Sequence, residues 1–281
     1  IFQYQAENVL VYKNYIKFLK IDPKSIVNSE EIPFLPIRFF KSHKVISKRK
    51  VHEKIFLSSG TTQTGRSKHY VSSLKLYQNS FLKSFKINYG DIEGYTLLAL
   101  LPSYQEQGDS SLIYMTNELM KRANQKSRYI SKINPKTVEM IKKLEAKKVL
   151  LLGVSYALLD LAEQYEFDFS NWIVMETGGM KGRRKELTRS ELYGILKKAF
   201  NIETIHSEYG MTELLSQAYS KNDGDFYCPP WMSVNIREIN DPFEKCKKNK
   251  TWGINIIDLA NMYSCSFIAT DDLGKKTDKG F

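Results

Sequence analysis

The sequence predicts an α/β fold with a mostly parallel sheet, followed by a smaller β-rich part. Short apolar runs of strand type recur between residues 54 and 224, and most lead through a polar or glycine-rich loop into an amphipathic helix. Such units are typical of βαβ crossovers, which build parallel sheets. After about residue 225 the apolar runs are short and separated by turns, as in an antiparallel or barrel-like subregion.

The composition narrows the class of protein and of partner. The chain has 281 residues, 42% of them hydrophobic, which suffices for one large domain with a core. Its net charge of +11 suits an anionic ligand or an acidic partner. We expect no nucleic acid, because the basic residues are not interleaved with aromatic ones at a known motif spacing. Three cysteines without a CxxC pair favour a reducing compartment, the cytoplasm, and no apolar run approaches the ~20 residues of a membrane span.

The first 53 residues are expected to form a helix and an extended connector. Six apolar residues near the start follow helical spacing: Phe2, Ala6, Val9, Leu10, Ile16 and Leu19. Pro33 and Pro36 keep the residues before them out of the helical region, so this segment predicts a connector that lies on the body of the domain. The single large domain therefore has three parts, residues 1–53, an α/β part over 54–224 and a β-rich subregion over 225–281.

Four apolar runs of the α/β part predict parallel strands: Tyr95–Leu101, Lys148–Leu152, Trp172–Met175 and Asn201–Ile205. Helices are expected near Ser111, from Leu158 to Tyr165, and after a capping box at Thr188–Glu191. The last helix is expected to bury four residues: Leu192, Ile195, Leu196 and Ala199. Three later strands are expected: Ser233–Ile239, Gly253–Leu259 and Cys265–Thr270. In parallel sheets ligands bind at the carboxyl ends of the strands, so the loops that follow them are candidates for a site.

The loop after the apolar residues Ile55–Leu57 carries two glycines and six hydroxyl side chains before Lys68. Glycines let backbone N–H groups turn toward one point and hydroxyls add donors, a combination typical of a phosphate nest, with Arg66 supplying charge. It is not a Walker loop, because a second strand rather than a helix follows. The alternative is an ordinary Ser/Thr/Gly hairpin.

The segment Ser207–Glu213 places two carboxylates, those of Glu208 and Glu213, on either side of a glycine turn. One of them could hold magnesium and the hydroxyl of Thr212 could reach a phosphate. Alternatively, Glu213 only begins a helix, where an acid in the first turn is favoured.

Two further strand ends are candidates for nucleotide binding. After Met175 the paired glycines Gly178 and Gly179 would let a flat base lie against the backbone, or they open a solvated basic loop that contains Arg184 and Lys185. At Thr270–Gly274 an acid at a strand end can bind both ribose hydroxyls, or it begins a β-turn.

These four segments, in this order, resemble the adenylate-forming superfamily of acyl-CoA synthetases, luciferases and peptide-synthetase adenylation domains. Ser58–Thr62 with Gly65 looks like its phosphate loop, Tyr209–Glu213 like its Tyr-Gly-x-Thr-Glu motif, and Thr270–Gly274 lies where it has Thr-Gly-Asp. Within the superfamily the chain is similar to the acyl-protein synthetase (LuxE-type) family, the fatty-acid-activating component of bacterial luminescence systems. That similarity covers nearly the whole chain and includes the following stretches: Ile32–Phe40, Glu176–Arg183, Ser207–Gln217, Cys228–Met232 and Ile256–Gly274.

The resemblance implies an adenylate-forming large domain of N-terminal type and a two-step reaction. A carboxylic acid, expected to be a fatty acid, attacks the α-phosphate of ATP, and a thiol then takes the acyl group from the acyl-AMP. ATP and magnesium are the implied cofactors. The implied partners are an acyl-CoA-reductase-like protein or an acyl carrier.

The resemblance also implies a role for each matching residue. Thr212 would touch the α-phosphate and Glu213 would bind magnesium, as the catalytic pair. The β- and γ-phosphates would be held by Ser58, Ser59, Gly60, Thr61, Thr62 and Gly65. The adenine would lie between Gly178, Gly179 and the ring of Tyr209, with Gly210 in the turn. Asp272 would bind the ribose, although Asp271 replaces the motif's glycine and leaves open which aspartate does so. Gln107 and Gly108 would line the acid pocket.

The sequence departs from the resemblance at its end. Superfamily members continue into a small C-terminal domain with a catalytic lysine, and acyl-protein synthetases carry their acyl-accepting cysteine near the end; this sequence contains neither, so we expect a truncated end or a partner. Cys228 and Cys265 are expected to be structural rather than nucleophilic. The alternatives are an acyl- or aryl-CoA ligase of the phenylacetate type, or a non-catalytic nucleotide- or acyl-binding subunit of an acyl reductase complex.

Overall fold

The computed structural model of the chain describes residues 1–59, 65–101, 108–180, 184–185, 187–222, 224–238, 252–277 and 280–281. Two compact units are present. The first comprises Ile1–Phe81, Met211–Gln217 and Tyr227–Phe281, and the second comprises Leu82–Gly210 and Ala218–Phe226. The long helix α4 (Leu74–Tyr89) begins in the first unit and ends in the second.

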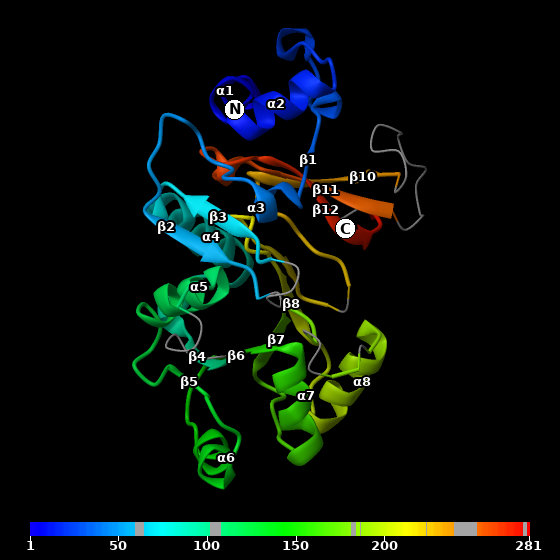
Figure 1. The fold of residues 1–281 in the computed structure, drawn as a ribbon. Helices are drawn as coiled ribbons and strands as arrows, with labels where there is room; N and C mark the ends of the chain where they lie inside the picture. Colours follow the sequence, from blue (N-terminus) through cyan, green and yellow to red (C-terminus); the bar gives the residue numbers. More distant parts are fainter. Residues whose placement is uncertain are drawn as a thin grey trace. The chain divides into compact units, whose positions relative to one another are not determined.

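The second unit contains the predicted parallel sheet, with the strand order β5-β4-β6-β7-β8-β9 (Figure 1). Its strands are β4 (Thr96–Leu100), β5 (Arg128–Tyr129), β6 (Val149–Val154), β7 (Ile173–Thr177), β8 (His206–Tyr209) and β9 (Ala218–Ser220). Only the pairing of β8 with β9 is antiparallel among these strands. The helices between them are α5 (Ser111–Met120), α6 (Pro135–Lys142), α7 (Ser155–Gln164) and α8 (Arg189–Phe200), and a 3₁₀ turn, η4 (Ile92–Gly94), precedes β4. The predicted α/β class with a mostly parallel sheet is therefore confirmed.

Two details of the predicted α8–β8 region are wrong. The strand expected at Asn201–Ile205 begins only at His206, because Asn201 ends α8 in the left-handed conformation with φ 48° and the chain needs the following residues to turn. Ser207 and Glu208 consequently lie within β8 rather than in a loop. Ile195 is 37% exposed, since the buried stripe of α8 runs through Leu192, Leu196 and Phe200 instead. The capping box at Thr188–Glu191 is confirmed.

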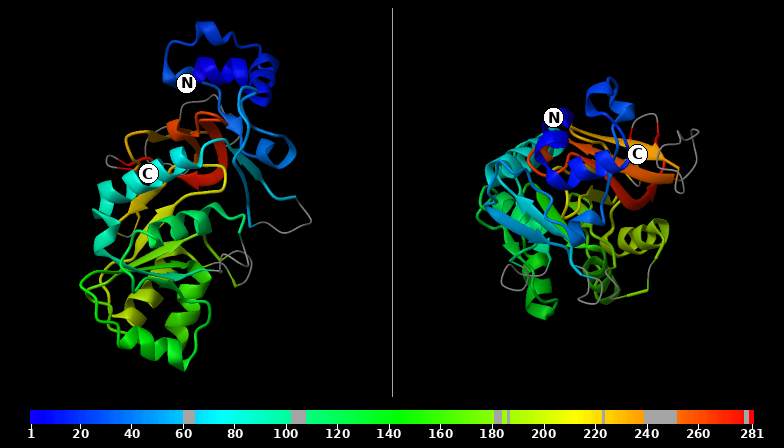
Figure 2. Two further views of the ribbon diagram at one scale, coloured as in Figure 1. Left: turned by 90° about the vertical axis from the view of Figure 1, so that its left-hand side faces the viewer. Right: turned by 45° about the horizontal axis from the view of Figure 1, so that its top comes forward.

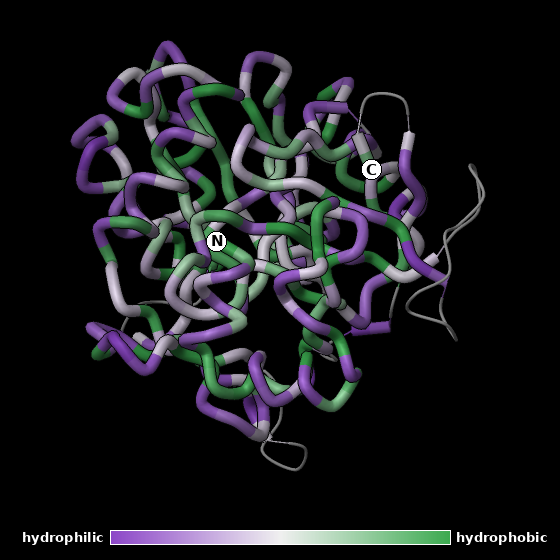
Figure 3. Tube along the Cα trace, turned by 90° about the horizontal axis from the view of Figure 1, so that it is seen from above, coloured by the Kyte–Doolittle hydropathy of each residue, from purple (hydrophilic) through white to green (hydrophobic). Residues whose placement is uncertain are grey.

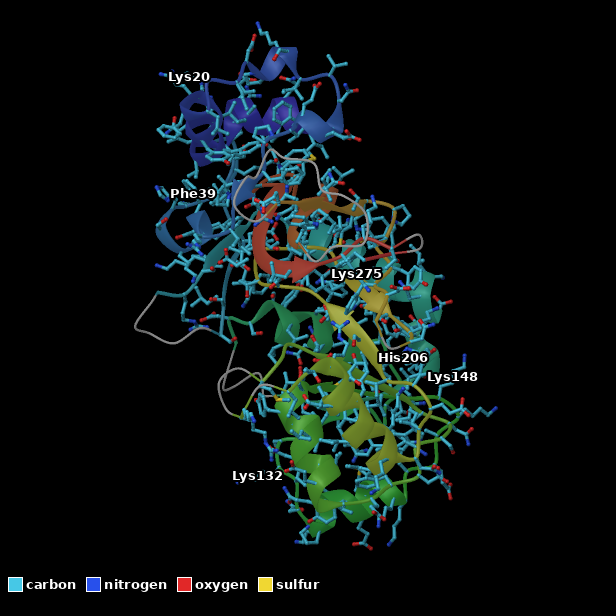
Figure 4. The ribbon with its side chains drawn as sticks, turned by 90° about the vertical axis from the view of Figure 1, so that its right-hand side faces the viewer. Lys20, Phe39, Lys132, Lys148, His206 and Lys275 are labelled. Carbon is cyan, nitrogen blue, oxygen red and sulfur yellow. The ribbon has the colours of Figure 1, made fainter. Side chains whose placement is uncertain are left out.

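A cluster of aromatic side chains packs at the amino-terminal end of this sheet. The Tyr95 hydroxyl donates to the carbonyl of Tyr89, whose own hydroxyl lies 3.1 Å from Nδ1 of His206. Lys148 lies over the Tyr95 ring, 5.5 Å from its centroid, and both Lys148 and His206 are labelled in Figure 4. These contacts tie the start of β4 to the last turn of α4 and to β8.

The first unit contains a four-stranded sheet with the order β1-β12-β11-β10 and a separate two-stranded hairpin. The sheet strands are β1 (Leu35–Pro36), β10 (Met232–Arg237), β11 (Trp252–Asp258) and β12 (Phe267–Gly274), and the hairpin strands are β2 (Lys54–Leu57) and β3 (Lys68–Val71). The strands β10, β11 and β12 pair in antiparallel fashion, as predicted for the β-rich part. The predicted connector supplies β1, an edge strand parallel to β12, where a proline is tolerated.

The N-terminal segment forms two helices rather than one, α1 (Phe2–Asn8) and α2 (Leu10–Phe18). Val9 between them is extended, with φ −98° and ψ 99°, because it forms an isolated antiparallel bridge with Ser47. Short helices complete this part: η1 (Pro23–Ser25), η2 (Ser29–Glu31) and α3 (Phe39–Ser42). These blue segments and the orange and red C-terminal strands belong to the same unit (Figures 1 and 2).

Aromatic packing and one buried amide join the N-terminal helices to the C-terminal strands. The Phe267 ring on β12 packs edge-on against Phe2 and stacks on Tyr12. Gln5, which is fully buried, donates to the carbonyls of Asn261 and Met262 and accepts from the backbone N–H of Ser266. Figure 3 colours the trace by hydropathy, and hydrophilic (purple) and hydrophobic (green) stretches alternate along the chain.

Candidate functional site

The carboxyl ends of the parallel strands lie level with one another in the second unit. Leu100 of β4 pairs with Gly153 of β6, and Val154 pairs with Thr177 at the end of β7. Thr177 in turn pairs with Glu208 of β8. Because ligands of parallel sheets bind outside this edge, the loop that follows Thr177 and the end of β8 at Tyr209 are well placed for a ligand.

Two carboxylates at this edge are held by hydroxyl groups. The Thr177 hydroxyl donates to Glu208 Oε2 over 2.5 Å, and Glu208 is buried. Glu176 accepts hydrogen bonds from the hydroxyls of Ser155 and Ser207. These bonds compensate for taking the carboxylates out of water, which is otherwise costly. Glu208 therefore orders the strand ends, and of the two acids of the predicted turn it is Glu213 that stays a candidate for metal binding.

The paired glycines after β7 both have a left-handed backbone conformation. Gly178 has φ 75° and Gly179 has φ 65°, where side chains with a Cβ are strained. A Cβ on Gly179 would meet no heavy atom within 4 Å, so conformation rather than crowding accounts for glycine there. Arg184, farther along the loop, forms ion pairs with Asp160 and Glu163 of α7.

The ring of Tyr209, at the end of β8, has an aromatic neighbour in the same unit. Its centroid lies 5.8 Å from that of the Phe226 ring. The Arg189 guanidinium lies over the Phe226 ring, 5.1 Å from the centroid of that ring. The Arg189 guanidinium also donates to the carbonyl of Gly224. The tilted contact with Phe226 orders the Tyr209 ring, for which we predict contact with the base.

In the first unit β2 and β3 form the predicted hairpin, with Leu57 paired to Lys68. Its stem is closed by three bonds. The N–H of Ser58 donates to the carbonyl of Ser67, the N–H of Ser67 donates to the Ser58 hydroxyl, and Arg66 Nε donates to the carbonyl of Ser58. Gly65 is left-handed with φ 72°, and Ser59 is exposed. Gly60, Thr61 and Thr62 lie outside the described residues.

The carboxyl group of Glu213 lies at this stem. The side chain is only 6% exposed, and the Ser67 hydroxyl donates a hydrogen bond to it. Burial raises the pKa of Glu213, while the bond from Ser67 and the charge of Lys41 act in the opposite direction. Residues Met211–Leu214 form a turn closed by a bond from the Leu214 N–H to the Met211 carbonyl, so the alternative that Glu213 begins a helix is wrong.

The two adjacent aspartates at the end of the chain differ in their surroundings. Asp271 is exposed and lies 3.4 Å from Nε of Arg38. The N–H of Asp272 donates to the hydroxyl of Thr270. Its negative charge contributes to the raised pKa of Glu213. Of the two, Asp272 is thus the one whose charge is felt at the hairpin stem.

Three buried polar residues near Glu213 were not predicted from the sequence to belong to a site. His69 of β3, Asp258 at the end of β11 and Asn261 of η5 (Leu259–Asn261) each contact the segment from Thr212 to Ser216. His69 appeared in the sequence only as part of a second strand, and no local pattern distinguishes Asp258 or Asn261. They were detectable only through contacts between residues far apart in the chain.

The remaining predicted residues divide between described and undescribed parts. Gln107 lies outside the described residues, and Gly108 lies in the turn before Ser110, the N-cap of α5.

Burial raises the pKa of both Cys228 and Cys265 to about 12. Cys265 is buried, whereas Cys228 is partly exposed.

Neither a metal cluster nor a membrane helix is found in the described part of the chain. No three His, Cys, Asp or Glu side chains of the described residues are grouped to hold a metal ion. Magnesium, however, is commonly bound by one or two carboxylates together with substrate phosphates and water, so a single carboxylate such as that of Glu213 is compatible with this cofactor.

Among the residues that the structure describes, none of the helices combines the length and the apolar character needed to cross a bilayer.

No protein-family model and no curated protein matches the chain. Solved structures do match. 2-Hydroxyisobutyryl-CoA ligase in complex with 2-HIB-AMP and CoA in the thioesterification state is 14% identical, with a TM-score of 0.74 over 99% of this chain and 62% of the ligase. An open conformation of that ligase with the same ligands is 12% identical, with a TM-score of 0.71 over 99% and 63%. ATP-bound MatB from Rhodopseudomonas palustris is 16% identical, with a TM-score of 0.59 over 80% and 46%.

These matches concern the fold. The chain has the fold of the N-terminal part of adenylate-forming ligases, as the sequence predicted. It spans between 46% and 63% of the length of these solved structures.

Proposed function

We propose that the chain uses ATP to activate a carboxylic acid as an acyl-AMP and then passes the acyl group to a thiol. The fold supports this, since the matching structures include an ATP-bound protein and a CoA ligase with a bound acyl-AMP. The observation that carries the proposal lies within the first unit. There the buried Glu213 carboxyl receives a hydrogen bond from Ser67 at the stem of the hydroxyl-rich hairpin, and Lys41 adds positive charge.

The chemistry assigned to this group of residues is positioning and charge neutralisation. Glu213 would hold magnesium, which when bound neutralises charge on the phosphates of ATP. Thr212 would donate to the α-phosphate. The described hairpin residues Ser58, Ser59 and Gly65, together with Gly60, Thr61 and Thr62, would donate to the β- and γ-phosphates. Fixed donors of this kind stabilise charge that develops in the transition state of an in-line transfer.

The nucleoside contacts are assigned by the same proposal. Gly178 and Gly179 would lie against the adenine and Tyr209 would stack on it, while Asp272 would accept hydrogen bonds from the ribose hydroxyls. The left-handed glycines and the ordered Tyr209 ring support these roles. Gln107 and Gly108 would line the pocket of the acid, for which we propose a fatty acid.

The thiol acceptor divides two versions of the proposal. In the acyl-protein synthetase version the acceptor is a cysteine of a partner or of a further part of the protein. The thiols of Cys228 and Cys265 do not suit this role, because burial raises their pKa, whereas reactive thiols have a lowered pKa and a larger thiolate fraction. In the second version coenzyme A takes the acyl group, which the CoA bound to the matching ligase favours.

Acid-dependent exchange of label between pyrophosphate and ATP tests the activation step. We expect exchange with at least one member of a panel of short, long and aromatic acids. Labelled acid, ATP and coenzyme A then distinguish the acceptors, since the label appears either on protein or in a soluble thioester. A folded protein that binds ATP but shows no exchange with any acid contradicts the proposal.

A further inference from the structure

The backbone of Thr212 and Glu213 is held by two side chains from other segments of the first unit. Nδ1 of His69 lies 2.8 Å from the carbonyl oxygen of Thr212. The amide nitrogen of Asn261 donates to the carbonyl of Glu213 over 2.7 Å. The two side chains also meet, with Nε2 of His69 3.0 Å from Oδ1 of Asn261. One polar chain therefore runs from β3 through η5 to the turn.

The residues that follow the turn are held in the same way. One oxygen of Asp258 accepts from the N–H of Leu215 over 2.7 Å, and the other accepts from the hydroxyl of Ser216 over 2.5 Å. The second oxygen also accepts from the N–H of Ala260, which ties Asp258 to η5. Four of the five residues from Thr212 to Ser216 are thus bonded to side chains of β3, β11 or η5.

These side chains are almost entirely removed from water. His69 and Asp258 are 0% exposed and Asn261 is 1% exposed. Burying polar groups is costly, and well-packed apolar residues would often stabilise a fold as well. Bulk stability is therefore a weak explanation for three polar side chains directed at one turn, whereas fixing the path of that backbone requires directional bonds.

We propose that His69 and Asn261 are positioning residues that fix the backbone of Thr212 and Glu213, so that both side chains are directed correctly for the transfer step. The inference rests on the proposed function for the roles of Thr212 and Glu213. His69 and Asn261 touch neither substrate nor metal in this proposal. They act through the two carbonyl groups that they contact.

The chemistry of the ring defines the variants that test the proposal. Both oxygens that face His69 are acceptors, so a neutral ring donates to one of them and a protonated ring donates to both. His69→Leu removes the ring's contacts, and His69→Gln keeps one amide donor. Asn261→Leu removes both contacts of Asn261, and Asn261→Asp keeps the shape but loses the donor to the Glu213 carbonyl.

Ser264→Ala is the matched control. The Ser264 hydroxyl is buried and donates to the carbonyl of Val45 over 2.8 Å, so its loss also removes one buried bond from a side chain to the backbone. Ser264 takes part in none of the hydrogen bonds that the His69 and Asn261 variants remove. Its loss is expected to lower thermal stability without affecting Thr212 or Glu213.

Two measurements are made on each variant, hydrogen exchange of the backbone amides of residues 211–217 and the kinetics of ATP–pyrophosphate exchange. We expect His69→Leu and Asn261→Leu to speed amide exchange in this segment about tenfold or more, since each loses buried bonds. We expect kcat to fall roughly 10- to 100-fold, with KM for ATP changed less than about threefold, because misplaced groups weaken the transition state more than binding. His69→Gln should recover most of kcat, and Ser264→Ala should match the wild type in both measurements.

The result that overturns the proposal is unchanged protection of residues 211–217 in the leucine variants. A loss of kcat in Ser264→Ala as large as in those variants also overturns it, because general destabilisation would then explain the effect. If a leucine variant does not fold, Asn261→Asp decides, since without its donor the segment must still exchange faster. Absence of ATP–pyrophosphate exchange in the wild-type protein counts against the proposed function instead, and amide exchange still decides whether the backbone is held.

Discussion

Glu213 is an acid whose side chain is 6% exposed and whose pKa is raised by burial, although it faces the Ser67 hydroxyl and the charge of Lys41. Burial disfavours the charged form of this carboxyl group, and a bound cation would favour it, as expected of a metal ligand. We predict that Glu213→Gln lowers ATP–pyrophosphate exchange by about 100-fold or more, because the fixed charge is lost. The free energy of unfolding should stay within about 1 kcal/mol of the wild type, because Gln keeps the shape and still accepts from Ser67.

The control for Glu213→Gln is Asp271→Asn, which removes an exposed carboxylate of the same unit. Both variants are assayed for exchange, and urea titration gives their stability. Exchange in Glu213→Gln above one tenth of the wild-type rate would exclude Glu213 from the site.

His69 gives a prediction about pH. Burial lowers its pKa from 6.5 to about 4, so between these values the unfolded chain binds a proton that the folded chain does not. Stability from this group is therefore complete above pH 6.5 and is lost as the pH falls toward 4. Relative to His69→Gln, the wild type should lose up to about 3 kcal/mol over this range.

Urea titrations of both chains at several pH values measure this difference. The raised pKa values of Glu213 and Asp258 act in the opposite sense, but both chains contain these groups, so the comparison largely cancels them. A difference in stability that is constant from pH 7 to pH 4.5 would show that His69 takes up its proton in the folded state as readily as in the unfolded one.

At the scale of elements, two glycines of the second unit should respond oppositely to substitution by alanine. A Cβ on Gly153, at the end of β6, would lie 2.6 Å from Cγ of Leu158 on α7, whereas a Cβ on Gly194, inside α8, would meet nothing within 4 Å. Gly153→Ala should cost about 1–3 kcal/mol through overpacking. Gly194→Ala should stabilise by up to about 1 kcal/mol, because alanine is the better helix former. Thermal unfolding of both variants measures this, and equal changes would contradict the packing described for β6 and α7.

Elements whose signal is local were predictable from the sequence. Every residue of β4 and β6 is buried, and continuous apolar runs of that length indicate interior parallel strands. The start of β8 was not predictable, because Asn201 adopts a left-handed cap and the strand itself reads His-Ser-Glu-Tyr, with half of it buried through hydroxyl and carboxylate bonds. The break at Val9 depends on a bridge to Ser47, 38 residues away, which leaves no trace in the helical spacing.

The candidate site follows the same rule. The hydroxyl-rich hairpin, the glycine pair and the Thr-Glu turn were found because their residue types are concentrated within a few positions of the chain. His69 and Asn261 were missed because each contact joins residues 48 to 192 positions apart. Side chains that bind a ligand are often clustered in sequence, whereas those that hold such segments in place need not be.

For the molecule as a whole, the net charge of +11 favours an anionic ligand. If ATP binds the folded chain and not the unfolded chain, it raises the free energy of unfolding. At a concentration of 100 times Kd the gain is about 2.7 kcal/mol, which for a chain of this size is roughly 5 °C in Tm. We expect ATP with magnesium to raise Tm by this order, and ATP without magnesium to raise it less. In Glu213→Gln the two should become equal, because the proposed magnesium ligand is gone. Differential scanning calorimetry with ATP, with GTP and with each plus magnesium measures these shifts. Equal Tm shifts with ATP and GTP in the wild type would mean that the stabilisation comes from general attraction between a basic protein and a polyanion. That result would contradict the proposal that the glycine turn after β7 recognises the adenine base.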